Sequence, residues 1–228
     1  MSLLTPKESR RYINILSSDG TLRENVPEKT PQAVKRDYEL KDGTKGTKFE
    51  LVYAKIEGIV RRVGIYEGDK FRSLHIVLEA ADGDSATLSI SAESSYGDDV
   101  MKKLPVVDIA LPVSFAPYSF EDDKGKNRRG MTIMQDGKKL QNYYYDFATK
   151  KPLHGFPEPE GDVNTFKKED WKIYFMKVHK FLIAETEKLI AAKFSSPWDE
   201  KPLTDEEKKN LAEIKAEVDA IDPDAIPF

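Results

Sequence analysis

The strongest constraint on the fold is a strand-like alternation of apolar and polar residues that begins at Phe49. In the segment FRSLHIVLEA, Leu74, Ile76 and Leu78 alternate with polar or smaller neighbours, which is the period of a half-buried β-strand. The preceding segment, FELVYAKIEGIVRRVGIY, is long for one strand, and its two internal glycines offer positions for a bend or bulge. The following segment, SATLSISA, repeats the alternation beyond an Asp-Gly-Asp turn. We therefore expect three consecutive strands in a meander.

A short helix and three more strands are expected after this meander. The segment YGDDVMKKL has the pattern of a helix that ends at Pro105, and IALPVSFAPYSF, MTIMQ and LQNYYYDF have the pattern of strands. One long bent strand, two more in a meander, a short helix and then further strands is the order of an OB-fold barrel. We therefore predict a mainly β fold with added helices, built on an OB-fold core over residues 48–150.

The regions on either side of this core have different patterns. Residues 1–47 form a polar N-terminal arm, in which the apolar spacing around residues 6–16 fits one face of a short helix. Residues 151–194 form a Pro/Gly-rich loop and a long helix. The wide apolar stripe of this helix predicts that it packs on the core or on a second subunit, so assembly into an oligomer stays open.

The net charge of −4 is unevenly distributed. Residues 195–228 form an acidic C-terminal tail with a short helix; they contain ten acidic and four basic residues, which gives a charge of −6. The rest of the chain has 32 basic and 30 acidic residues, which gives +2. A mildly basic body joined to an acidic end is an asymmetry of nucleic-acid-binding chains. The alternative is a tail that serves only solubility.

The composition and the missing motifs limit the cellular compartment and the kinds of catalytic or metal site that we expect. The chain has no cysteine, which excludes disulfides and thiolate metal sites and suits a reducing compartment, so we expect a cytoplasmic protein, in the host cytoplasm if it is viral. No signal-peptide segment and no apolar run of membrane-spanning length occurs, so we expect no membrane association. Motifs of phosphate loops, zinc proteases and serine hydrolases are missing, and the three histidines are scattered. We expect no catalytic residue, cofactor or metal.

Basic and aromatic residues interleave on the expected strands. Single-stranded nucleic acid is held by cations that follow the phosphates and by aromatic faces that stack on bases. The candidate basic residues are Lys55, Arg61, Arg62, Lys70, Arg72, Arg128, Arg129 and Lys139. The candidate aromatic residues are Tyr66, Phe71, Tyr118, Phe120, Tyr143, Tyr144 and Tyr145. Strand alternation limits the set: at least one of the three adjacent tyrosines must face the core, and Arg61 and Arg62 share a face only if a bulge intervenes.

The sequence ends in DPDAIPF, which resembles the C-terminal tip of bacterial single-stranded DNA-binding proteins, where several aspartates precede Ile-Pro-Phe. The resemblance implies that the Phe enters a hydrophobic pocket on replication and repair enzymes, while its carboxylate and the aspartates meet basic groups. The matching residues are Asp222, Asp224, Ile226, Pro227 and Phe228. The tip departs from the bacterial pattern because Ala225 interrupts it, and a charged helix replaces the usual linker. An OB core with additions and an acidic end looks more like bacteriophage single-stranded DNA-binding proteins.

The sequence therefore predicts a non-enzymatic, bacteriophage single-stranded DNA-binding protein for DNA replication, recombination or repair, with a tip that recruits partner enzymes. One alternative is a protein–protein adaptor whose OB-like barrel binds no nucleic acid. Another is a metal-dependent nuclease that uses the acidic run 121–123. The preference for DNA or RNA and the number of subunits stay open.

Overall fold

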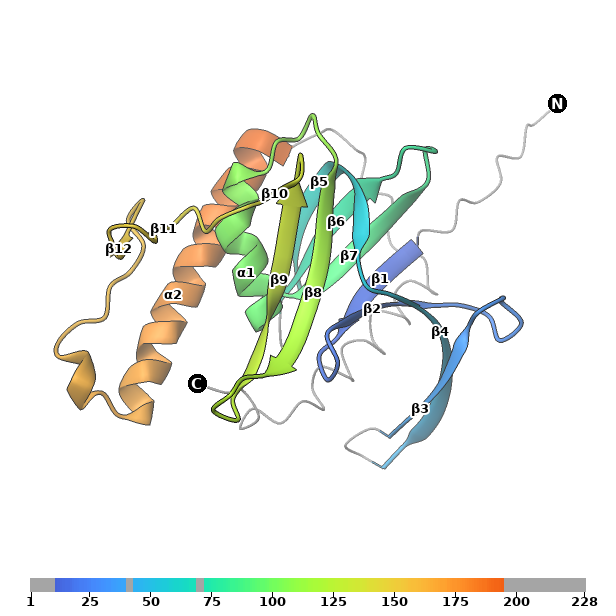
Figure 1. Ribbon diagram of the computed structural model, residues 1–228, viewed down its shortest axis with the longest axis horizontal. Coiled ribbons are helices and arrows are strands. Elements are labelled where there is room, and N and C mark those ends of the chain that lie inside the picture. The colour runs from blue at the N-terminus through green and yellow to red at the C-terminus, as the bar shows by residue number, and fades with distance from the viewer. Residues whose placement is uncertain (1–10, 40–42, 69–71, 195–228) are drawn as a thin grey trace.

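The computed structural model describes residues 11–39, 43–68 and 72–194 (Figure 1). Ten strands within these ranges form one sheet in the order β10-β9-β8-β5-β6-β7-β1-β2-β4-β3. The ten strands are β1 (Arg11–Leu16), β2 (Thr21–Asn25), β3 (Val34–Glu39), β4 (Lys45–Tyr53), β5 (Ile56–Glu67), β6 (Arg72–Glu79), β7 (Ser85–Ser91), β8 (Val113–Glu121), β9 (Asn127–Gln135) and β10 (Lys138–Lys139). A separate small pair is made by β11 (Tyr145–Asp146) and β12 (Lys151–Pro152).

The described part of the chain holds two α-helices, and the prediction of a mainly β fold with a long C-terminal helix is confirmed. The α-helices and the shorter helical segments are α1 (Ser95–Lys103), η1 (Leu104–Val106), η2 (Val163–Thr165), α2 (Lys168–Leu189) and η3 (Ile190–Phe194). The side chain of Ser94 caps α1 by accepting a hydrogen bond from the amide of Gly97 at 3.1 Å. The last two strands of the expected meander, the short helix and the next two strands correspond to β6, β7, α1, β8 and β9. The single long bent strand expected over residues 49–66 is wrong, because the chain forms two strands there: β4 pairs with β2 and β3, and β5 pairs with β6 and β8.

The core lies between the sheet and the two helices. Alternate residues of β6 and β7 are fully buried, among them Leu74, Ile76 and Leu88. α1 lies between β9 and α2, so it is covered on both sides (Figure 1). α2 contributes Val178 and Leu182 to the same apolar cluster. The apolar stripe of α2 therefore packs on the body of its own chain.

The sheet of ten strands does not close, so the OB-fold barrel that the sequence predicts is not confirmed. β7 pairs in parallel with β1, and α1 lies against β9. On β9, the amide of Met131 donates to Asp99 Oδ2 at 2.9 Å, and its carbonyl accepts from Lys103 Nζ at 2.6 Å. Two side chains of α1 thus satisfy backbone groups that a neighbouring strand would otherwise pair.

The N-terminal region extends the sheet. Residues 11–39, which the sequence assigned to an arm, form β1, β2 and β3. The helix expected around residues 6–16 is wrong over its described part, because Arg11–Leu16 is a strand. Pairing with β7 places Ile13 opposite Leu88 and buries it, and this distant contact overrides the local helical spacing.

The hairpin turn between β1 and β2 packs against β8. Gly20 has a φ of 67°, in the left-handed region that favours glycine. A Cβ atom on Gly20 would lie 2.7 Å from the backbone nitrogen of Ser119. The turn therefore approaches β8 at a distance that only glycine permits, which curls the sheet toward itself.

The strand expected over residues 140–147 is wrong. Only Tyr145–Asp146 is a strand, and its two residues pair with β12 and not with the main sheet. The surrounding residues form turns that pack on α2, with the ring of Tyr144 5.3 Å from that of Phe181. Aromatic residues suit strands, but here they fill the space between a loop and a helix.

Candidate nucleic-acid interface

The central strands turn one face to the core and a second face away from it. Residues that lie opposite each other on paired strands share a face, and the register aligns Gly64, His75, Ser89 and Asn14 in one row across β5, β6, β7 and β1. We call this second surface the polar face. Its members are Tyr12, Asn14, Arg62, Gly64, Tyr66, Ser73, His75, Val77, Thr87, Ser89 and Ser91.

A β-bulge in β5 brings both predicted arginines of this strand to the polar face. The pairing of β5 with β6 shifts register at Arg61. Arg61 donates two hydrogen bonds to the carboxylate of Glu79, at 3.0 and 2.9 Å. Arg62 lies opposite Val77, and its charge acts on His75. Because these three β6 residues alternate along the strand, Arg61 and Arg62 reach the same face.

Three aromatic rings gather on the polar face. The centroid of the Tyr66 ring lies 4.5 Å from that of His75, and Tyr12 approaches His75 edge-on at 6.1 Å. Tyr66 is 36% exposed, so part of its ring is open to a stacking base. His75 is only 7% exposed, and this burial, aided by the charge of Arg62, lowers the pKa of His75 to about 4. The imidazole is therefore neutral at pH 7.

Two buried atoms of the polar face have no hydrogen-bond partner among the described residues. They are Nε2 of His75 and Oδ1 of Asn14, which belong to the same row and are separated by Ser89. A buried polar atom left unpaired costs roughly 1–3 kcal/mol. The row therefore carries hydrogen-bonding capacity that the described part of the chain does not use.

A second group of predicted residues lies on the β8–β9 hairpin. Tyr118 and Phe120 are two residues apart on β8, their ring centroids are 5.9 Å apart, and Phe120 is 55% exposed. Arg128 lies opposite Phe120 and its Nε lies 2.8 Å from a carboxylate oxygen of Asp122. Arg129 follows on the other side of the strand, where its Nε is buried. This hairpin offers an aromatic pair beside one exposed arginine.

Two of the remaining predicted cations already contact carboxylates. Lys55 Nζ lies 3.3 Å from Glu57, and Arg72 Nε lies 3.0 Å from Glu67. Lys139 is exposed on β10. Exposed ion pairs contribute only about 0–1 kcal/mol, so exchanging such a carboxylate for a phosphate costs little.

The three adjacent tyrosines are held by local packing. Tyr144 is 4% exposed, and burial raises its pKa to about 12. Tyr143 stacks on His154 with centroids 3.9 Å apart, and Tyr145 meets Phe147 edge-on at 5.1 Å. Tyr144 thus belongs to the core, and its ring is not accessible to a base.

The polar face includes residues that the sequence did not single out. Strand alternation places His75 on the outward side of its strand, and this signal could have found it. Tyr12 and Asn14 could not be found, because their place depends on the parallel pairing of β1 with β7. Several predicted residues lie outside the described ranges, namely Lys70, Phe71, Asp222, Asp224, Ile226, Pro227 and Phe228.

The acidic run 121–123 organises the β8–β9 loop. Asp122 accepts hydrogen bonds from the amides of Lys124 at 3.0 Å and Lys126 at 2.9 Å. The hydrogen bond from the Lys126 amide is the first cause that lowers the pKa of Asp122, followed by the side chain of Arg128. Nowhere in the described ranges do three or more His, Asp or Glu residues gather as a metal site would require.

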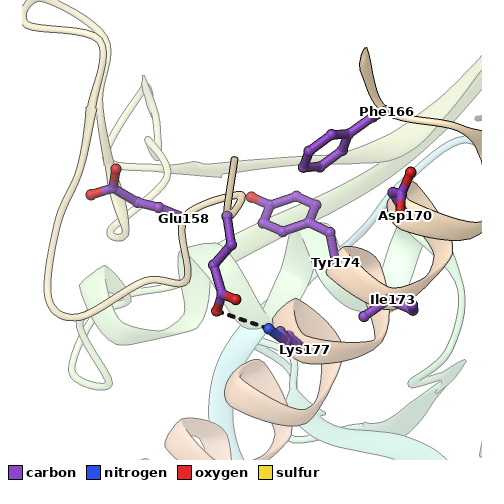
Figure 2. A pocket seen from close by; sticks show the side chains of 7 residues that line it. Glu158, Phe166, Asp170, Ile173, Tyr174 and Lys177 are labelled. Carbon is purple, nitrogen blue, oxygen red and sulfur yellow. Dashed lines mark hydrogen bonds and ion pairs between the residues drawn. The ribbon is translucent and has the colours of Figure 1, made fainter. Parts of the chain in front are cut away.

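A pocket of about 130 Å³ lies between α2 and the loop before it, away from the predicted residues. Figure 2 shows the rings of Phe166 and Tyr174 on one side, and Lys177 reaching the carboxylate of Glu160 at 2.9 Å. Glu158 and Asp170 add two further acidic groups to the lining. Three carboxylates against one ammonium group make this pocket unsuitable for a phosphate.

Neither described α-helix combines the length and the apolar character needed to cross a membrane.

Comparison with known proteins finds no relative of this chain. The chain matches no protein-family model, no curated protein and no solved structure.

Proposed function

We propose that the protein binds single-stranded DNA along the polar face and acts in DNA replication, recombination or repair. The observation that carries the proposal is the grouping of Arg62, Tyr66 and Tyr12 around His75, with Arg61 further along the same face beside Glu79. Cations that neutralise phosphates and rings that stack on bases are the two devices of sequence-tolerant single-strand binding. Of the β7 hydroxyl residues on the same face, Thr87 and Ser89 are buried, and the half-buried Ser91 is the one that can meet the sugar-phosphate chain.

The strand pairing supports the same proposal. β5 pairs with both β6 and β8, β6 pairs with β7, and α1 stands between β7 and β8 in the chain. This part resembles an OB-fold, a partly open barrel whose outer strand face binds oligonucleotides. In this proposal β5–β9 are an OB-like core, and β1–β4 are an addition that extends the binding face.

In this proposal the C-terminal tip binds the partner enzymes. Its resemblance to the bacterial tip suggests that Phe228, with Ile226 and Pro227, enters a pocket on replication or repair enzymes. The aspartates Asp222 and Asp224 then meet a basic rim. A protein from a bacteriophage with such a tip would recruit enzymes in the host cytoplasm.

A protein–protein adaptor is the second candidate, and two observations favour it. Arg61, Arg72 and Arg128 are each engaged by a carboxylate. α2 also exposes apolar side chains, with Ile173 55% and Met176 50% exposed. Exposed apolar groups on a helix are a common feature of protein-binding surfaces.

The test is fluorescence anisotropy of a labelled mixed-sequence single strand, titrated with the full-length protein at two salt concentrations. The proposal predicts binding that weakens as salt rises, with much weaker binding to the corresponding duplex. Absence of single-strand binding at low salt, with and without residues 195–228, would leave the adaptor as the better account.

A further inference from the structure

We propose that the row His75–Ser89–Asn14 reads the hydrogen-bonding edge of one nucleobase and favours bases with an exocyclic amino group over thymine. This inference rests on the proposed function, because it assigns a base-reading site within the single-strand interface. It also departs from purely sequence-tolerant binding, since stacking and phosphate contacts alone do not distinguish bases by their edges.

The row crosses three neighbouring strands. His75 is on β6, Ser89 is opposite it on β7, and Asn14 is opposite Ser89 on β1. Neighbouring strands are about 4.8 Å apart, so roughly 10 Å separates the backbones of His75 and Asn14. Both unpartnered atoms, Nε2 of His75 and Oδ1 of Asn14, occur at the two ends of this row.

The chemistry of the two atoms selects the base. A carboxamide oxygen only accepts hydrogen bonds, so Oδ1 of Asn14 requires a donor. In our proposal Oδ1 of Asn14 meets position 4 of cytosine or position 6 of adenine, where the exocyclic amino group donates. At position 4 thymine presents a carbonyl oxygen, and its donor, N3–H, lies one position further along the edge. Neutral His75 has one ring nitrogen that donates and one that accepts, so it can pair with the group next to the amino group.

Access to the row requires movement of an aromatic side chain. Nε2 of His75 and Oδ1 of Asn14 are covered in the free protein. The rings beside His75 are those of Tyr66 and Tyr12. In our proposal one of these rings swings aside when DNA binds, and its face then stacks on the bound base.

The decisive measurement compares oligonucleotides that differ only at the reading edge of the base. Full-length protein is titrated with equal-length strands of dC and dU, and separately of 5-methyl-dC and dT, so that the 5-methyl group is matched within each pair. We expect the amino-bearing member of each pair to bind about 5-fold tighter or more, which is the discrimination expected of a good base contact.

Substitutions then assign the preference to the row. Asn14→Leu removes the carboxamide at similar volume, and we expect it to reduce the dC to dU affinity ratio to about 1. Asn164→Leu, the same substitution at an exposed asparagine of η2 outside the polar face, serves as the control and should keep the wild-type ratio. His75→Phe is the second variant, in case Asn14→Leu fails to give a folded protein by thermal unfolding.

Each outcome separates this inference from the proposed function. Equal affinity within both pairs, with single-strand binding intact, overturns the base-reading site and leaves the proposed function standing. A preference that survives both substitutions shows that the bases are read elsewhere. A changed melting temperature of Asn14→Leu with an unchanged ratio assigns Asn14 a structural role and overturns its role in base reading. Failure of all four strands to bind overturns both proposals.

Discussion

Tyr66 is the residue of the polar face whose ring is most open to a base. It is 36% exposed and lies beside His75 on a face that also carries Arg62. Stacking of one base on an aromatic ring contributes roughly 1–3 kcal/mol. We therefore expect Tyr66→Ala to weaken single-strand binding by about 5-fold to 100-fold in anisotropy titrations, and Tyr66→Phe to keep most of the affinity.

The matched control for this prediction is Phe147→Ala. Phe147 is 62% exposed, but it lies between the two short strands β11 and β12, outside the polar face. Its removal should leave the affinity unchanged. An equal loss of affinity in Tyr66→Ala and Phe147→Ala would mean that binding depends on exposed aromatic area in general and not on the polar face.

His75 makes the stability of the protein depend on pH. Its folded-state pKa of about 4 lies below the ordinary histidine value near 6.5, because burial and the charge of Arg62 disfavour the imidazolium. Between these two values the unfolded chain binds more protons than the folded chain, so stability is lost as the pH falls. The contribution of His75 amounts to about 2 kcal/mol between pH 7 and pH 4.5.

Urea denaturation at the two pH values tests this dependence. His75→Gln cannot titrate, so the loss of unfolding free energy on acidification should be about 2 kcal/mol smaller than in the wild type. His154→Gln, which removes an exposed histidine, should behave like the wild type. The same pH dependence in wild type and His75→Gln would show that the imidazole is not held neutral.

The hairpin turn between β1 and β2 sets how closely this element approaches β8. Both Gly20 and Gly83 occupy hairpin turns with positive φ, at 67° and 87°. An added Cβ at Gly20 would press on the backbone of Ser119 at 2.7 Å, whereas at Gly83 it would meet nothing within 4 Å. Substitutions at the two glycines therefore distinguish the cost of the left-handed backbone, which both positions share, from the cost of the contact with β8, which Gly20 alone of the two makes.

We expect Gly83→Ala to cost about 1 kcal/mol of unfolding free energy, from the left-handed backbone alone. Gly20→Ala adds displacement of β8 and should cost roughly 2–3 kcal/mol in total. Urea denaturation of both variants measures the difference. Similar losses in the two would mean that the turn does not constrain β8.

Local patterns predicted those elements whose partners are close in the chain. The alternation in FRSLHIVLEA and SATLSISA predicts β6 and β7, which pair through a tight turn. Tyr12, Ile13 and Leu16 have helical spacing as well as strand-forming character, and only the distant pairing with β7 decides for the strand. The strand predicted over the three adjacent tyrosines is wrong for the same reason, because Tyr144 packs on Phe181 of α2, which is distant in the chain, and not on the main sheet.

At the scale of the whole molecule, the closure of the sheet could not be predicted from strand order. The strand and helix order expected from the sequence matches an OB-fold, but closure depends on whether β9 meets a strand from the other end of the sheet. The strand that pairs with its outer edge is the two-residue β10. Here Asp99 and Lys103 of α1 take both backbone groups of Met131, and β1 takes the edge of β7. Two residues of the polar face depend on this outcome, because Tyr12 and Asn14 reach it only through the pairing of β1 with β7.

The distribution of charge over the whole chain leads to the last prediction. Residues 195–228 carry −6 and the remainder carries +2, so the tail is attracted to the basic groups that would otherwise hold phosphates. If the protein binds DNA as proposed, we expect the tail to compete for the polar face in the absence of DNA and bound DNA to release the tip to its partners. Deleting residues 195–228 should therefore tighten single-strand binding several-fold near 50 mM salt. The gain should disappear at high salt, because the screening length shortens to about 3 Å at 1 M.

Phe228→Ala provides the control, because it removes no charge and should leave the DNA affinity as in the wild type while abolishing recruitment of partner enzymes. Anisotropy titrations of full-length protein, the truncated protein and Phe228→Ala across a salt series measure the DNA affinity and its salt dependence. Equal affinities of full-length and truncated protein at low salt would exclude competition by the tail. The acidic residues would then serve solubility or partner binding alone, and the polar face would have to bind DNA without regulation from its own chain.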